Sequence, residues 1–279
     1  MTAENFARPK EYAKTKVAEF WDAASCGETL YLPTLTREGY EEQARQRYAL
    51  EPFIVEFAEF DRWRGKSVFE IGVGLGADHQ RFAEEGARLT GIDLTPRAID
   101  HVRRRFEALG LTSDLSVSDA EDLPFPDGTF DLVYCYGVIH HTPNTAAAAQ
   151  EILRVLKPGG EFRVMIYHRR SLVGLMLWLR YGLATGHPFT TMTEIYARHL
   201  ESPGTKAFTQ AEAVNLFSLA EDVSTHVVLT HGDLLESSAG QRHRGAVLNI
   251  ARAVWPRWLL RRIARGWGLF LFVTGRKRA

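Results

Sequence analysis

The first 65 residues repeat their apolar side chains at helical spacing. Residues from Pro9 to about Ala24 read as one helix, and a second helical region begins near Thr36 and restarts at Pro52. Apolar residues that recur every three or four positions are typical of amphipathic helices. We therefore expect residues 1–65 to form an amino-terminal helical cap.

Residues 66–168 alternate short apolar runs with helical patterns. The runs predict strands at 67–71, 88–92, 114–117, 130–136 and 161–167. The segments between them predict helices that run through Phe82, from about 96 to 109, and from about 144 to 156, and residues 157–160 predict a turn. Strands that alternate with helices indicate βαβ units. This pattern predicts an α/β fold built on a doubly wound, mostly parallel sheet.

The alternation stops after Tyr167. Residues 169–208 predict an insertion with one apolar helix at Leu172–Leu183, which we expect to cover the active site. Residues 209–279 would complete the sheet, with a helix near 210–219 and strands near 223–229 and 268–274. The last run is continuously apolar, which is typical of a buried strand.

The composition is that of an ordinary globular protein, with 45% hydrophobic and 24% charged residues. The two cysteines, Cys26 and Cys135, form no C-x-x-C pair, which favours a reducing cytoplasm. No signal peptide is expected, and the longest apolar stretch is shorter than the roughly 20 residues of a membrane span. We therefore expect a soluble, cytoplasmic protein; the oligomeric state stays open.

The formal net charge is zero, but the charges are unevenly distributed. No acidic residue follows Glu236, whereas nine arginines and one lysine do, interleaved with Trp255, Trp258 and Trp267. This basic segment has two interpretations: a solvated face around a packed terminal hairpin, or attraction to an anionic acceptor or membrane surface. The first is favoured because charge blocks are usually solvated; peripheral membrane contact stays open.

A glycine-rich turn after the first predicted strand indicates a nucleotide site. Glu70 precedes Gly72, Gly74 and Gly76, and Asp93 ends the next strand. In open α/β sheets, ligands bind beyond the carboxyl ends of the strands. The same residues loosely fit a dinucleotide fingerprint. Three features disfavour that alternative: the Glu70 carboxylate opposes a pyrophosphate, Asp119 adds a further contact, and no second βαβ half is available for nicotinamide.

Residues 66–168 resemble class I S-adenosylmethionine (SAM)-dependent methyltransferases, in the branch with quinone and small-molecule methylases. The resemblance rests on four ordered motifs: VFEIGVGLGAD (68–78), TGIDLTPRAI (90–99), SDAEDLPFPDGTFDLVYCYGVIHHT (118–142) and LRVLKPGGEFRVMIY (153–167). It implies a Rossmann-like, seven-stranded sheet whose last strand, 268–274, is antiparallel. The implied cofactor is SAM, and the product is S-adenosylhomocysteine (SAH).

The resemblance also implies how the cofactor is held. Glu70 and the three glycines would line its methionine part, and Asp93 would bind the ribose. Leu94 would pack on the adenine, Asp119 and Ala120 would hold the adenine edge, and Tyr136 would contact the cofactor through its backbone.

Methyl transfer to an acceptor that loses a proton requires a base. His141, Tyr167 and His168 are the candidates, because they follow the fourth strand or end the fifth. His141 is preferred, since histidines titrate near neutrality, although a helix-start or packing role is an alternative. No metal is expected, because two adjacent histidines, His140 and His141, do not easily face one ion and no ligand spacing supports them.

The function predicted is methyl transfer to a small, partly hydrophobic organic acceptor. Phe20, Trp21 and the helix at Leu172–Leu183 would form the acceptor pocket, with ordinary core packing as the alternative. Lys206 is expected to be exposed. Two other functions stay open: a nucleic-acid methyltransferase, which the absence of an appended RNA-binding module disfavours, and a non-catalytic SAM-binding protein.

Overall fold

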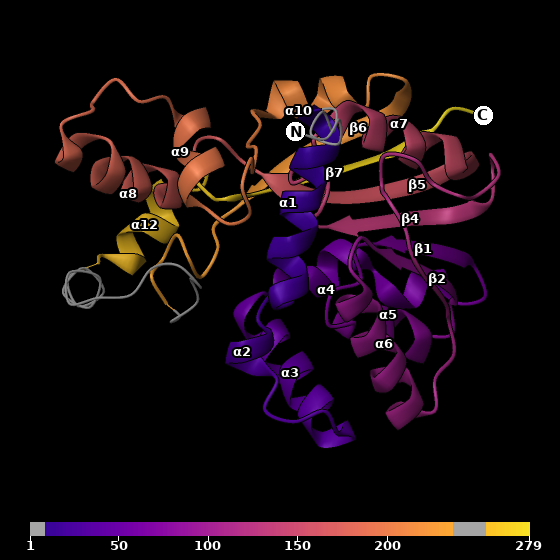
Figure 1. Ribbon diagram of the computed structural model, residues 1–279. Coiled ribbons are helices and arrows are strands. Elements are labelled where there is room, and N and C mark those ends of the chain that lie inside the picture. The colour runs from indigo at the N-terminus through magenta and orange to yellow at the C-terminus, as the bar shows by residue number, and fades with distance from the viewer. Residues whose placement is uncertain (1–8, 237–254) are drawn as a thin grey trace, which may run out of the picture.

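The computed structural model describes residues 9–236 and 255–279. Seven strands form one sheet in the order β3-β2-β1-β4-β5-β7-β6 (Figure 1). Their bounds are β1 Ser67–Ile71, β2 Arg88–Asp93, β3 Asp114–Val117, β4 Phe130–Tyr136, β5 Leu156–Tyr167, β6 Ala220–Val228 and β7 Phe270–Lys277. The first five strands are parallel, and β7 runs antiparallel to both β5 and β6. The Rossmann-like, mostly parallel sheet with an antiparallel last strand is confirmed.

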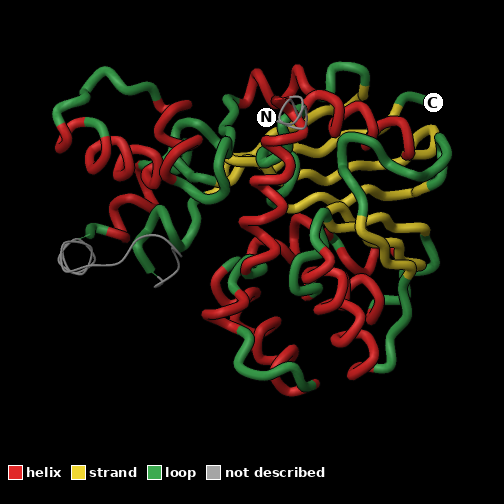
Figure 2. Tube along the Cα trace, in the orientation of Figure 1, coloured by secondary structure: helices red, strands yellow, loops and turns green. Residues whose placement is uncertain are grey.

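Helices cover both faces of the sheet, as Figure 2 shows. The amino-terminal block contains α1 Pro9–Ala23, α2 Glu28–Tyr31, α3 Arg37–Leu50, α4 Phe53–Ala58 and the 3₁₀ turn η1 Phe60–Trp63. The core helices are α5 Ala77–Glu84, α6 Pro96–Leu109, α7 Thr145–Val155 and α10 Gln210–Leu216. The insertion and the segment before β7 contain α8 Leu172–Tyr181, η2 Leu183–Thr185, α9 Met192–His199 and α12 Arg257–Ile263.

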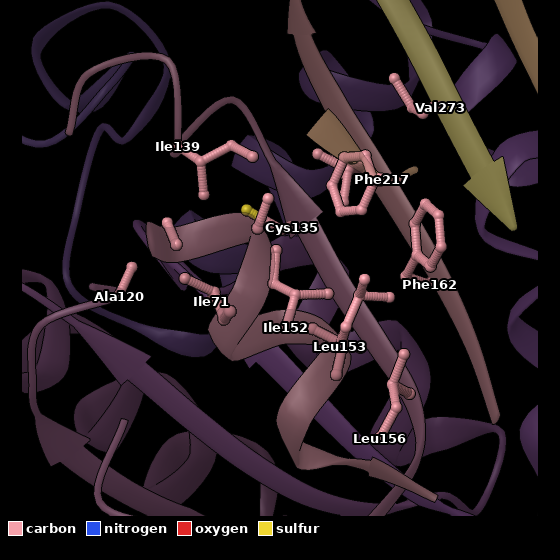
Figure 3. Packing of buried hydrophobic residues seen from close by; sticks show 14 of the residues in the cluster. Ile71, Ala120, Cys135, Ile139, Ile152, Leu153, Leu156, Phe162, Phe217 and Val273 are labelled. Atoms are coloured by element: carbon pink, nitrogen blue, oxygen red, sulfur yellow. The ribbon is translucent and has the colours of Figure 1, made fainter. Parts of the chain in front are cut away.

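The alternation of side chains along each strand divides the core into two layers. In β4, Val133 and Cys135 face α7 and α10, and Figure 3 shows this layer around Cys135, Ile152 and Phe217. Leu132 and Tyr134 face the opposite layer, which α4, α5 and α6 cover. Successive strand residues point to opposite faces, so both faces of a central strand must be apolar.

Local capping explains where the helices begin. The Thr95 side chain accepts a hydrogen bond from the backbone N–H of Ala98, Pro96 occupies the first turn of α6, and Gly110 ends that helix in a left-handed conformation. An N-cap threonine, a proline in the first turn and a glycine at the end are the residues that helix termini favour. α6 therefore starts immediately after β2, which holds Asp93 at the carboxyl edge of the sheet.

Several predicted boundaries are wrong. β5 begins at Leu156, because Leu156 pairs with Phe130, so the expected turn at 157–160 lies inside an irregular strand. The helix expected to reach Leu183 stops at Tyr181, where Gly182 follows. The helix expected near 210–219 stops at Leu216, and β6 starts at Ala220 rather than Val223.

The last strand runs to Lys277, three residues beyond the predicted end at Thr274. The Arg276 guanidinium lies 3.4 Å from Glu161, and the Lys277 ammonium donates to the carbonyls of Arg154 and Leu156 at 2.9 and 2.8 Å. The end of the basic segment is therefore bound to the sheet. Arg242, Arg244 and Arg252 lie outside the described residues.

We keep the four-part division of the chain as a proposal: cap 1–65, core 66–168, insertion 169–208 and completion of the sheet 209–279. No helix within residues 9–236 or 255–279 has the length and apolarity that crossing a bilayer requires.

Candidate functional site

The carboxyl ends of the central strands open into one cavity of about 1020 Å³. Its wall includes Gly72 after β1, Asp93 at the end of β2, Asp119 after β3 and Tyr136 at the end of β4. Helix α1 crosses these strand ends in Figure 1, and Val17, Phe20 and Trp21 belong to the same wall. Protein sites for small ligands are commonly about 300–1,000 Å³. This cavity is therefore large enough for a nucleotide-sized ligand and a second molecule.

The glycine-rich loop gives this cavity its floor. Gly72 has a φ of 79°, and a Cβ there would lie 2.1 Å from a methyl carbon of Val138. Left-handed backbone is unfavourable for residues with a side chain, and the contact with Val138 excludes even alanine without a shift. The loop thus approaches the cavity with bare backbone, as close approach to a ligand requires.

Glu70 and Asp78 lie buried beside this loop. Glu70 lies 2.8 Å from Nδ1 of His79, and Asp78 accepts hydrogen bonds from the Arg47 guanidinium at 3.0 and 2.7 Å and from the Tyr134 hydroxyl at 3.0 Å. Burial, followed by the charge of Asp78, raises the pKa of Glu70 well above its ordinary range. Arg47 and Asp78 both line the cavity, and neither was predicted from the sequence as a site residue.

Asp93 is shared between the loop and the start of α6. One carboxylate oxygen accepts the backbone N–H of Gly74 at 3.2 Å, and the other accepts the backbone N–H and hydroxyl of Thr95 at 3.0 and 2.9 Å. Burial raises the pKa of Asp93, and these hydrogen bonds oppose the rise. Leu94 follows it in the cavity wall. Asp93 is therefore held at the cavity edge, where it can accept further donors.

Helix α1 supplies a cation to the third strand end. The Lys14 ammonium pairs with the Asp119 carboxylate and lies 2.8 Å from Glu121. Asp119 also accepts the backbone N–H of Glu121 at 2.9 Å, and Ala120 beside it is buried in the cavity wall. A ligand that uses the Asp119 carboxylate must therefore share it with Lys14. No spacing in the sequence indicates this contact, because 105 positions separate the two residues.

Tyr136 contributes its ring as well as its backbone. The ring lies below the Arg47 guanidinium at 5.0 Å, and its hydroxyl donates to Glu51 at 3.2 Å. Burial, followed by the charge of Glu51, raises the pKa of Tyr136 well above its ordinary range. The Tyr136 hydroxyl is therefore neutral, and it helps to hold the partly buried Glu51 carboxyl against Arg47.

Of the three predicted catalytic residues, two meet at one side of the cavity. Nδ1 of His141 lies 2.8 Å from the Ser202 hydroxyl, and its Nε2 lies 3.4 Å from the Glu201 carboxylate. The Tyr167 hydroxyl donates to the same carboxylate at 2.6 Å. His141, Tyr167 and Glu201 line the cavity together. Glu201 was not predicted from the sequence.

The structure places His168 elsewhere. It is buried, its Nδ1 lies 3.2 Å from the Gly268 carbonyl, and it does not belong to the cavity wall. The expectation that His168 faces the cleft is wrong. β7 pairs with the end of β5, and the His168 ring lies against the segment that leads into β7. We leave His168 out of the proposed catalytic residues.

Lys206 was expected to be exposed, but the structure shows it half-buried. Its ammonium donates to the carbonyls of Thr142 and Pro143 at 2.6 and 2.8 Å. These carbonyls directly follow His141 in the chain. Lys206 thus binds the segment after His141, and it does not line the cavity.

The histidine pair is arranged differently from the expectation. His140, His141 and Glu201 each offer a ligand atom within 4.8 Å of the others. The expectation that the two adjacent histidines do not easily face one ion is therefore wrong. His140 is fully buried, its ring lies 4.0 Å from the Tyr167 ring, and burial lowers its pKa well below the ordinary range. His140 is therefore neutral, and we assign it to packing against Tyr167.

The remaining wall of the cavity is apolar. Phe20 and Trp21 come from α1, Met176 and Leu177 come from α8, and Phe270 comes from β7. Trp21 also packs edge-on against His141, with 5.3 Å between ring centroids. The two segments predicted to surround the acceptor therefore do lie on one cavity, beside His141.

The comparisons with known proteins agree with this arrangement. Residues 69–164 match the family model described as "Methyltransferase domain". The chain contains a class I SAM-dependent methyltransferase domain. The matched residues span β1 to the middle of β5, so this domain includes all four strand ends around the cavity. SAM is accordingly its cofactor, and the sequence-based identification of the family is confirmed.

Two curated relatives are named as methyltransferases of a hydroquinone and of a fatty acid. The chain is 33% identical over 150 residues to a 2-methyl-6-phytyl-1,4-hydroquinone methyltransferase of Synechocystis, covering 50% of the chain and 46% of the relative. It is 36% identical over 124 residues to a fatty-acid O-methyltransferase of Mycolicibacterium smegmatis, covering 44% of each. The chain thus spans less than half the length of these relatives.

A solved structure extends the similarity of fold beyond the methyltransferase domain. An N-methyltransferase of Haemonchus contortus, solved with phosphomonomethylethanolamine and SAH, superposes with a TM-score of 0.55 at 17% identity. The match covers 98% of this chain and 59% of the other. At this identity, the likeness concerns the fold alone.

Proposed function

We propose that this protein transfers the methyl group of SAM to a small, apolar organic acceptor. One observation carries the proposal: the strand-end cavity joins an acidic, glycine-floored part to an apolar part made by α1, α8 and β7. Small-molecule sites are mostly apolar and contain a few convergent polar groups. The acidic part suits the cofactor, and the apolar part suits the acceptor.

The chemistry of the acidic part fits SAM. We propose that it is held by Glu70, Gly72, Gly74, Gly76, Asp93, Leu94, Asp119, Ala120 and Tyr136, with Arg47 added from α3. When bound, SAM supplies a methyl group on a positively charged sulfur. The buried carboxylates favour a cation and ribose hydroxyl donors, and they would oppose the pyrophosphate of a dinucleotide. Arg47, which comes from α3 and lines the cavity, would pair with the carboxylate of the methionine part of SAM.

Replacing Asp93 by alanine is expected to weaken SAH binding by about ten- to a hundredfold. A hydrogen bond to a charged group contributes about 1.5–3 kcal/mol, which corresponds to this range. Isothermal titration calorimetry measures the change. Thr95→Val is the control, because it removes one donor to Asp93 and the cap of α6 but leaves the carboxylate; it should weaken binding only slightly. Equal losses in both variants would show that Asp93 acts only by holding the loop.

The acceptor side contains a base and its supports. We propose that Nε2 of His141 takes the proton of an acceptor O–H or N–H, while the Ser202 hydroxyl accepts from Nδ1–H. The Glu201 carboxylate, 3.4 Å away, then stabilises the positive charge that forms on His141. Tyr167, which donates to the same carboxylate, keeps Glu201 in place. The methyl group replaces the proton on the acceptor, and the electron pair of the broken bond remains on sulfur.

The proposed acceptor class follows from the apolar wall. The hydroquinone and fatty-acid methyltransferases among the relatives agree with it, although each matches only part of this chain. A long apolar acceptor would bury its chain between Trp21, Met176 and Leu177, with its polar group beside His141.

A radiometric screen with methyl-labelled SAM tests the proposal. We expect label to enter apolar acceptors, namely hydroquinones with an isoprenoid tail, fatty acids and sterols. Label that enters only polar amines or RNA would contradict the acceptor class. Tight SAH binding without transfer to any acceptor would favour a non-catalytic SAM-binding protein.

A further inference from the structure

The helices after β5 form a lobe that extends away from the sheet. We call α8, η2, α9 and α12 the lobe; Figure 1 shows it to the left of the strands, and Figure 2 shows its helices joined by long loops. The sheet core does not cover all of its apolar side chains. The proposed methyl transfer uses the side of α8 that lines the cavity and assigns no role to the exposed side.

One stripe of the lobe is apolar and exposed. Leu175 and Leu179 lie four residues apart on α8, and Leu183 begins η2; the three side chains are 37%, 43% and 50% exposed. Residues four apart lie on the same side of a helix, so Leu175 and Leu179 share one side of α8. Large exposed apolar patches are uncommon on monomeric proteins and indicate interaction sites.

Helix α12 adds aromatic and basic side chains to the lobe. Trp258 and Ile263 are 73% and 67% exposed, and Arg262 and Arg265 beside them are exposed too. Glu236 pairs with Arg261, and no acidic residue follows Glu236 in the sequence. Residues 169–200 contain four arginines and one acid, Glu194. The lobe therefore combines exposed apolar groups with a positive charge.

The exposed stripe borders the cavity. Leu179, Arg180 and Ala184 belong to the cavity wall, and so does Trp255, which directly precedes α12. Because Leu179 is both in the wall and 43% exposed, it lies where the cavity meets the surface. A molecule that passes this edge moves from the apolar surface of the lobe into the apolar part of the cavity.

We propose that the lobe docks on the surface of an anionic lipid bilayer. Exposed tryptophan and leucine side chains insert into the interface, and arginines attract anionic headgroups. The charge of the lobe is complementary to such a surface, and its apolar groups would otherwise remain in water. Docking does not depend on the proposed function; only the further step, in which the bilayer delivers the acceptor to the cavity, rests on it.

Vesicle sedimentation tests this proposal without SAM or an acceptor. We expect the full chain to co-sediment with phosphatidylcholine vesicles that contain phosphatidylglycerol, weakly with phosphatidylcholine alone, and less as salt is added. The double variant Arg262→Gln, Arg265→Gln should lower the partition coefficient about 25-fold, from about 1 kcal/mol, or about fivefold, for each arginine near the surface. Trp258→Ala should lower binding to both kinds of vesicle.

The matched control is the double variant Arg103→Gln, Arg104→Gln. Both arginines are exposed on α6, away from the lobe, so this variant should bind vesicles as the wild type does. Equal losses in the two double variants would overturn the proposal, because they would indicate nonspecific charge. It would also be overturned by no preference for anionic vesicles. Analytical ultracentrifugation that shows a dimer, lost in Trp258→Ala without vesicle binding, would instead assign the surface to a second copy of the chain.

Discussion

Replacing His141 by asparagine is expected to lower kcat at least about a hundredfold while SAH affinity changes less than about threefold. A positioned base contributes about a hundred- to ten-thousandfold to a proton transfer. His141 lies on the acceptor side, beside Trp21 and Glu201, whereas the glycine loop and Asp93 lie on the cofactor side. Turnover is measured with an acceptor from the radiometric screen, and affinity is measured by calorimetry.

His168→Asn is the matched control for this variant. His168 is buried like His141, but it lies outside the cavity wall, and asparagine can still donate to the Gly268 carbonyl. We expect kcat to change less than about threefold. If His141→Asn lowered SAH affinity and turnover by the same factor, His141 would be a structural residue and the proposed base would be wrong.

Gly72→Ala is expected to lower the free energy of unfolding by about 2–5 kcal/mol and to abolish measurable SAH binding. The left-handed conformation costs about 1–2 kcal/mol for a residue with a Cβ, and overpacking adds about 1–3 kcal/mol. The added carbon would lie 2.1 Å from Val138. Relief of this contact must move the loop or the segment after β4, both of which line the cavity. Urea unfolding and calorimetry measure the two effects.

Gly128→Ala separates strain from contact. Gly128 also has a positive φ, 68°, but nothing lies within 4 Å of its added Cβ. We expect this variant to lose about 1–2 kcal/mol of stability and to bind SAH normally. If Gly72→Ala behaved in the same way, the loop would tolerate a side chain, and the close approach of its backbone to the cofactor would be contradicted.

The sheet and the cofactor side of the site follow from local sequence patterns. The site residues of the first four strands, such as Gly72 and Asp93, end these strands or closely follow them in the chain. Once the parallel order of the strands is expected, these residues must meet at one edge. A pattern within about ten residues therefore predicts both the element and the position of its last side chain.

The contacts across the cavity were not predictable in this way. Lys14 pairs with Asp119, and Arg47 pairs with Asp78, across separations of 105 and 31 residues. No periodicity links such residues, and their meeting depends on how the helical cap packs on the strand ends. Glu201 was missed for the same reason, because its partner His141 belongs to a loop 60 positions earlier.

Strand boundaries failed where pairing overrides local preference. The Lys-Pro-Gly-Gly stretch at 157–160 has the composition of a turn, yet β5 includes it, because Leu156 pairs with Phe130. Likewise, Arg276 and Lys277 are charged but extend β7, because Glu161 and the backbone carbonyls of Arg154 and Leu156 accept their donors. Tertiary partners thus determined where these two strands begin and end.

The central claim is that the parallel strand ends bind an adenosine together with its attached amino acid. Calorimetric titration of the folded protein with SAH tests it most directly. We expect saturable binding at one site per chain, weakened about ten- to a hundredfold by Asp93→Ala. A well-folded protein that takes up neither SAH nor SAM would contradict the account.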